Sequence, residues 1–121
     1  MENTSKIEQF VQKVIENTTI KEIIWEAIDQ KINLVNLSQE GVRVYKANIG
    51  GKYFRIFKAI EEFYNDHGEG PYKKNTIVFQ LIDNNNNLIR DIKIGKSGND
   101  LMEVVTKMDA TLDDFLSEYL K

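Results

Sequence analysis

The middle of the chain carries a run of positive charge that is suited to binding an anion. Residues 41–60 contain five basic residues and no acid, whereas the segments before and after them are both net acidic. The five are Arg43, Lys46, Lys52, Arg55 and Lys58. Aromatic residues are interleaved with these cations, and that combination is typical of surfaces that bind single-stranded nucleic acid. The segment is therefore the first candidate for a binding site.

A glycine pair inside this segment predicts how the cations are arranged. Gly50-Gly51 separates two runs rich in β-branched and aromatic residues, which favours a hairpin with a two-residue turn. The resulting register places Lys46 opposite Arg55 and Arg43 opposite Lys58. Like charges that face each other destabilise a sheet. We therefore expect a compensating group, which is either a bound anion or the acidic side chains of the flanking segments.

The predicted function is that of a small non-catalytic binding or regulatory domain of the accessory, inhibitor or immunity type. It would act through a protein–protein surface formed by the exposed sheet face and the loop at residues 64–75. The candidate partner-binding residues are Arg43, Lys46, Tyr53, Arg55, Lys58 and Tyr72. The alternative is binding of single-stranded nucleic acid or another anion by the 42–59 hairpin. A formal net charge of −3 repels a polyanion at long range, which favours the protein partner.

A third hypothesis is a small hydrolase or transferase centred on His67, the only histidine. Asp66 precedes it, and a carboxylate that orients an imidazole is a feature of general-base catalysis. No nucleophile motif accompanies the pair, so we expect His67 to be structural or exposed to solvent. The Asp83-x-Asn85-x-Asn87 spacing resembles the start of a calcium loop, but Leu88 occupies the position of the required glycine. We interpret this segment as a polar hairpin tip and expect no metal or cofactor.

The elements that position these residues follow from hydrophobic periodicity. Apolar residues within 5–17 recur at helical spacing behind a capping box at Ser5, and a second helix is predicted over 20–30. A second hairpin is predicted around the turn at 83–87, with Asp83 paired to Leu88. One face of that hairpin should be core and the other mostly wet. The wet face would carry Val78, Gln80, Ile82, Ile89, Asp91 and Lys93.

The C-terminal region is predicted to be helical, capped by Asn99, either as one helix or broken near residues 109–111. Its apolar stripe is suited to packing on the sheet and also to a homodimer seam. The expected fold class is α+β. N-terminal helices precede two consecutive hairpins that form a roughly four-stranded antiparallel sheet, and a C-terminal helix or helix pair packs on one face.

Length and composition bound the remaining possibilities. At 121 residues the chain is predicted to form one domain over residues 1–121. With no cysteine and one histidine it has no thiolate chemistry and no Cys- or His-rich metal centre. No signal-peptide or membrane-spanning run is present, so we expect a cytoplasmic protein without a membrane partner. Asn, Lys and Ile supply 40 of the 121 residues, which indicates an AT-rich bacterial or phage genome.

Overall fold

The computed structural model describes residues 4–29, 37–38 and 43–120. The elements in chain order are α1 (Thr4–Thr19), β1 (Glu26–Ile28), β2 (Leu37–Ser38), β3 (Val44–Ile49), β4 (Lys52–Phe63), β5 (Tyr72–Ile82), β6 (Leu88–Ile92) and α2 (Ser97–Tyr119). The predicted α+β class and the antiparallel pairing are confirmed. The sheet is larger than the predicted four strands, because two short strands precede the first hairpin.

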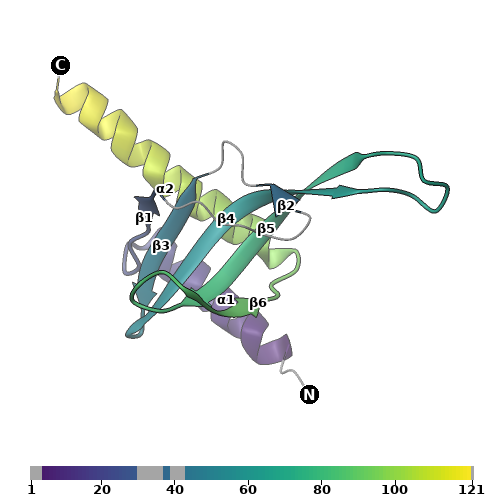
Figure 1. Ribbon diagram of the computed structural model, residues 1–121. Coiled ribbons are helices and arrows are strands. Elements are labelled where there is room, and N and C mark those ends of the chain that lie inside the picture. Colours follow the sequence, from purple (N-terminus) through teal and green to yellow (C-terminus); the bar gives the residue numbers. More distant parts are fainter. Residues whose placement is uncertain (1–3, 30–36, 39–42, 121) are drawn as a thin grey trace.

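Five strands form a continuous path in the order β1-β3-β4-β5-β6 (Figure 1). The first hairpin has the predicted register, with Ile49 paired to Lys52 across the glycine turn. Both turn glycines have positive φ, which a two-residue hairpin turn of this kind requires. The two-residue strand β2 pairs with β4 at Ile60 and Glu61. Because β5 occupies the opposite edge of β4 there, β2 continues the edge on which β3 ends.

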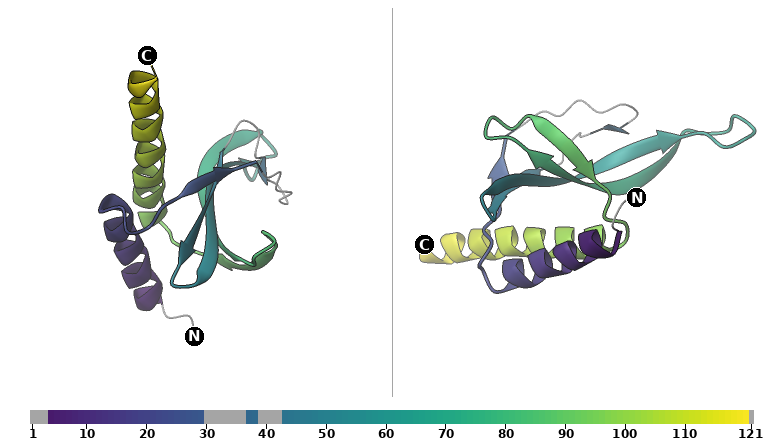
Figure 2. Two further views of the ribbon diagram at one scale, coloured as in Figure 1. Left: turned by 90° about the vertical axis from the view of Figure 1, so that its left-hand side faces the viewer. Right: turned by 90° about the horizontal axis from the view of Figure 1, so that it is seen from below.

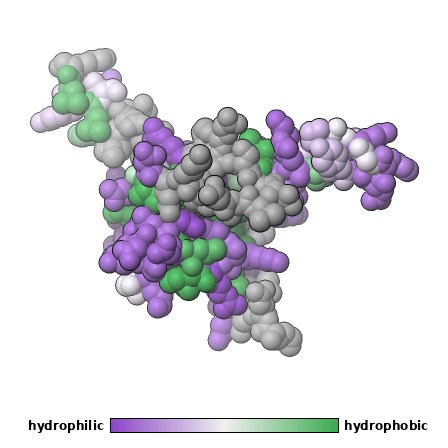
Figure 3. Space-filling model, in the orientation of Figure 1, coloured by the Kyte–Doolittle hydropathy of each residue, from purple (hydrophilic) through white to green (hydrophobic). Residues whose placement is uncertain are grey.

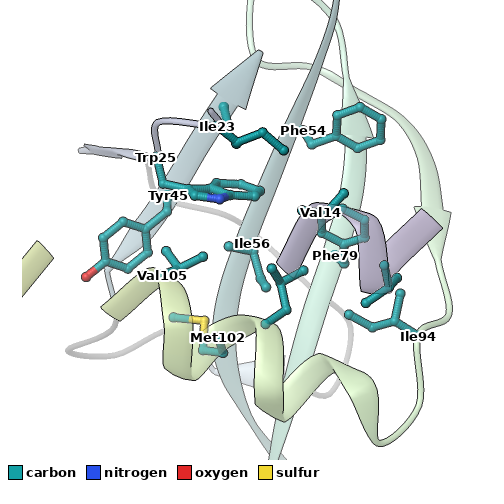
Figure 4. Close-up of a cluster of buried hydrophobic side chains, with 13 residues drawn as sticks. Val14, Ile23, Trp25, Tyr45, Phe54, Ile56, Phe79, Ile94, Met102 and Val105 are labelled. Atoms are coloured by element: carbon teal, nitrogen blue, oxygen red, sulfur yellow. The ribbon is translucent and has the colours of Figure 1, made fainter. Parts of the chain in front are cut away.

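Both helices lie side by side against one face of the sheet (Figure 2). Between these two layers lies the larger core, in which the Phe54 and Phe79 rings stack with centroids 5.5 Å apart. Figure 4 shows how side chains from both helices and from the sheet converge there. Trp25 adds its ring to this core, and its indole N–H donates a buried hydrogen bond of 3.0 Å to the Thr18 hydroxyl. The core therefore fixes the sheet relative to both helices.

The second helix predicted over 20–30 is wrong. α1 ends at Thr19, and Lys21 then adopts a left-handed φ of 65°. Ile23 and Trp25, two residues apart, are both buried, which is the period of an extended chain. The chain continues into β1, whose backbone pairs with β3. Tertiary pairing and burial at alternate positions thus override a local pattern that fits a helix.

The register predicted for the second hairpin is confirmed for three successive pairs, from Phe79 with Ile92 to Leu81 with Arg90. A register shift then pairs Ile82, instead of Asp83, with Leu88. The prediction that the face away from the helices is mostly wet is wrong for its centre. Gln80 and Ile82 are buried there, and a second small cluster is formed by Val44, Phe57 and Ala59.

α2 is one continuous helix, which is the first of the two predicted alternatives, and it has no break near residues 109–111. It begins at Ser97, so Asn99 is not its cap. Leu101 and Val105 are buried against the sheet and α1, as predicted for the stripe. The helix then continues past the sheet (Figures 1 and 3). Phe115 and Tyr119, in its last turns, are 59% and 76% exposed. None of the described helices is both long and apolar enough to cross a lipid bilayer.

Candidate functional site

A row of polar side chains crosses the whole sheet on the face away from the helices. One residue comes from each strand of the continuous path: Glu26, Lys46, Arg55, Gln80 and Asp91. Directly paired residues of antiparallel strands point to the same face, so the five lie along one line. We call this set the polar row. It contains the predicted Lys46–Arg55 pair, which the strand register confirms.

Arg55 is the buried centre of the polar row, with 4% of its surface exposed. Its Nε donates to Gln80 Oε1 at 2.6 Å, and one terminal nitrogen donates to the Asn86 carbonyl at 3.0 Å. Gln80 in turn donates from Nε2 to Asp91 Oδ1 at 2.5 Å. Burial lowers the pKa of Arg55 below its ordinary value, and the charge of Asp91 opposes that shift. The guanidinium is therefore compensated from within the fold.

Lys46 is held by the same turn that covers Arg55. Its ammonium group donates a hydrogen bond to the Asn86 side-chain oxygen. It also lies 4.6 Å from the centroid of the Tyr53 ring, which is a favourable cation–π distance. Asn86 thus links Lys46 and Arg55 to the β5–β6 turn.

The turn itself is ordered by Asp83. Its Oδ1 accepts hydrogen bonds from the backbone N–H groups of Asn85 at 2.8 Å and Asn87 at 2.9 Å. Asn86 adopts a φ of 67°, which asparagine tolerates better than most residues. These hydrogen bonds, led by the one from the Asn87 backbone, hold the pKa of Asp83 below its usual value, and desolvation opposes the shift. The predicted polar hairpin tip is confirmed, and its carboxylate is engaged within the turn.

The structure brings together only some of the predicted binding residues. Lys46, Tyr53 and Arg55 are adjacent. The predicted Arg43–Lys58 pair is not part of the ladder, because β3–β4 pairing ends one residue earlier. Arg43 and Lys58 are exposed.

Tyr72 lies at the start of β5, far along the sheet from the polar row. The loop predicted at 64–75 is shorter, since β5 begins at Tyr72 and pairs with β4 as far as Phe63. Beyond the helices these two strands project as a two-stranded ribbon, which is drawn at the right of Figure 1. We call residues 60–75 the arm. Almost all of its side chains are exposed.

Three exposed aromatic residues lie near the end of the arm. The Phe63 and Tyr72 rings are paired across the two strands with centroids 5.6 Å apart, and 44% and 43% of their surfaces remain exposed. Tyr64 is 62% exposed. A side chain on Gly70 would place Cβ 2.9 Å from the Tyr64 ring, so a glycine is needed for this approach. Phe63 and Tyr64 were not among the predicted binding residues, although the aromatic pair flanking the only proline-containing loop was a usable signal.

The tip of the arm is an ordered loop organised by Asn65. Its side-chain oxygen accepts hydrogen bonds from the backbone N–H groups of His67 at 3.0 Å and Glu69 at 2.8 Å. The Asn65 backbone N–H donates to the Glu69 carbonyl at 3.0 Å. His67 is exposed, as predicted, and its backbone takes part in the loop. These hydrogen bonds therefore order the loop that joins the two strands of the arm.

Two further features bear on chemistry. Among the described residues, no group of three or more His, Cys, Asp or Glu side chains is arranged to hold a metal ion. An open groove of about 710 Å³ lies between α1 and the residues that precede α2, and acids and lysines share its lining.

Comparison with protein-family models, with curated proteins and with solved structures finds no match to this chain.

Proposed function

We propose that this chain is a non-catalytic protein-binding module, of the accessory, inhibitor or immunity type, and that the arm is its binding element. The observation that carries the proposal is the group of three exposed aromatic side chains, Phe63, Tyr64 and Tyr72, held on an ordered projection. Large aromatic residues contribute more to protein interfaces than most other types, because they bury much surface at a small entropy cost.

The shape of the arm supports the same conclusion. Its two strands extend past the helices, so the helix-side core does not cover the aromatic side chains. Isolated two-stranded hairpins are marginally stable in water, and apolar side chains exposed on one favour association with another surface. A partner protein that covers the arm would bury these rings. It would either pack on a face of the ribbon or add a third strand to it.

Binding of nucleic acid by the 42–59 hairpin has less support. Arg55 is buried beneath the β5–β6 turn, and the Lys46 ammonium is already hydrogen bonded to Asn86. Exposing these two cations to phosphate groups requires displacement of the turn. The arm, and not the centre of the sheet, is therefore the proposed binding element.

The test is site-specific photo-crosslinking in cells of the species that encodes the protein. A photoreactive phenylalanine replaces Tyr64 at the tip of the arm, and a matched variant carries it at Glu103, which is exposed on α2. We expect a discrete protein adduct from the Tyr64 position and none from the Glu103 position. Introducing Tyr72→Ala into the Tyr64 variant should abolish the adduct. Equal adducts from both positions, or none from the tip, would refute the proposed role of the arm.

A further inference from the structure

One edge of the arm is open along its length. From Tyr72 to Val78, β5 pairs with β4 on one side. On the other side, pairing with β6 begins only at Phe79, and no strand in the described part of the chain covers the remainder. Such an edge presents backbone donors and acceptors that can pair with an added strand.

The pairing pattern identifies which backbone groups face outward. The pair that flanks a two-residue turn, here Ile49 and Lys52, is hydrogen bonded, and hydrogen-bonded pairs then alternate across an antiparallel sheet. Continued through β4 and β5, this alternation directs the backbone N–H and C=O groups of Lys73, Asn75 and Ile77 away from β4. The open edge therefore has three residues positioned to receive a strand.

The charge of the edge identifies the strand that fits it. β5 contains Lys73 and Lys74 and no acidic residue. On the side of β5 that faces β4, these two lysines lie opposite Glu62 and Glu61. On the outer side of β5, no acidic residue of a described strand lies opposite Lys73 or Lys74. An incoming strand with two adjacent acids would repeat there the pairing that β4 already makes.

We propose that the outer edge of β5 binds an extended acidic segment of the partner protein by strand addition. This inference rests on the proposed function and specifies its partner. A second copy of the chain is a poorer occupant, because its own β5 edge would add two further lysines without an acid. Lysines placed on an edge strand oppose such pairing between copies and leave acidic strands as the favoured ligands.

The probe is a fluorescent peptide with the sequence of residues 58–64, which contains the adjacent glutamates of β4. Its control peptide has lysine at both glutamate positions. We expect the acidic peptide to bind about tenfold more tightly than its control, since two attractive charge contacts become repulsive. In amide NMR spectra of the full chain, the acidic peptide should shift the signals of Lys73, Asn75 and Ile77.

Two variants at one position separate backbone recognition from side-chain recognition. Asn75→Pro removes an outward-facing N–H at an edge position that accepts proline, and we expect it to weaken binding of the acidic peptide at least about tenfold. Asn75→Ala keeps the N–H and should bind within about twofold of the natural chain. Lys73→Glu, which leaves the backbone unchanged, should abolish the preference for the acidic peptide and provides the test if Asn75→Pro does not fold.

The outcomes distinguish this inference from the proposed function. Equal binding of both peptides, or equal binding by the Pro and Ala variants, would overturn strand addition. A dimer that forms with increasing concentration and is lost in Asn75→Pro would assign the edge to a second copy and also overturn it. If the Tyr64 adduct persists in Asn75→Pro while Tyr72→Ala abolishes it, the arm binds its partner through the rings and the edge inference alone fails.

Discussion

Arg55 is a charged residue with a structural role, because it is buried within the sheet. Its position in β4 places it between Lys46 and Gln80. Burial of a guanidinium is tolerated only when its donors find acceptors, and those acceptors include the Gln80 side chain and the Asn86 carbonyl. The residue therefore connects the centre of the sheet to the β5–β6 turn.

We expect Arg55→Met to lower the free energy of unfolding by about 2–4 kcal/mol, because it leaves Gln80 Oε1 without its donor in a buried site. The matched control is Lys52→Met at an exposed position of the same strand, with an expected change within about 0.5 kcal/mol. Urea denaturation measures both. The double variant Arg55→Met/Gln80→Leu should recover part of the loss, because it removes the unpaired acceptor as well. Equal stability of the two single variants would show that the network does not stabilise the fold.

Asp83 makes the stability of the chain depend on pH in a known direction. Its pKa is lower in the folded chain than the ordinary 3.8, so its contribution to stability is present above pH 3.8. That contribution is lost as the pH falls below 3.8 through the folded value. Asp83→Asn should be less stable than the natural chain at pH 7, and the difference should shrink on acidification below pH 3.8.

Thermal unfolding at pH 7, 4 and 3 measures this convergence. The control is Asp66→Asn, whose carboxylate accepts no hydrogen bond from the described residues and whose replacement should leave stability unchanged at pH 7. A constant difference between Asp83→Asn and the natural chain at all three pH values would contradict the proposed electrostatic role of the turn.

At the scale of elements, the arm and the C-terminal end of α2 both project from the fold, and they differ in the contacts that hold them. The arm is continuous with the two central strands of the sheet, and its end is fixed by hydrogen bonds around Asn65. The C-terminal end of α2 continues a helix whose first half buries one face, with Leu101 and Val105 in the core, but Leu116 and Leu120 are 41% and 77% exposed. The described part of the chain therefore gives the arm a defined tip and leaves the end of α2 dependent on the helix alone.

We expect a chain that ends at residue 114 to unfold with nearly the same free energy as the full chain, within about 1 kcal/mol. The residues removed include Phe115 and Tyr119, whose rings stack on each other and are largely exposed. By contrast, Leu101→Ala in the buried half of α2 should cost about 2–5 kcal/mol. Denaturant titration compares the three proteins. A loss from truncation as large as that of Leu101→Ala would mean that the end of the helix packs on the fold.

At the scale of the whole molecule, charge and layering act together. Two helices cover one face of the sheet, and the opposite face carries the polar row, the second apolar cluster and the β5–β6 turn. The chain has a formal net charge of −3, and its central cations are hydrogen bonded within the fold. This arrangement leaves the arm and the end of α2 as the two exposed aromatic surfaces of the described molecule.

We expect no binding of a single-stranded DNA or RNA oligonucleotide at low salt, because the net charge is negative and Lys46 and Arg55 have internal partners. Fluorescence anisotropy with a labelled oligonucleotide measures this. An affinity that weakens steeply with salt and is lost in Lys46→Glu would support the 42–59 hairpin as a nucleic-acid site and count against the arm as the principal binding element.

Local patterns in the sequence were sufficient to predict much of the fold. The N-terminal helix, both hairpins and the helical C-terminus follow from periodicity and turn residues, which act between neighbours in the chain. The same reasoning paired Lys46 with Arg55 correctly, since the two-glycine turn sets that register. It also predicted that like charges in the hairpin need a compensating group.

Only the tertiary structure decided which group that is and where the open surface lies. Gln80 and Asn86 reach Arg55 because β5 pairs with β4, a contact between residues that are 25 and 31 positions apart. Residues 20–28 fit a helix locally, yet burial of Trp25 and pairing with β3 draw them into the sheet. Such long-range contacts depend on how the layers assemble, and that information is not contained in the spacing of residues along any single segment.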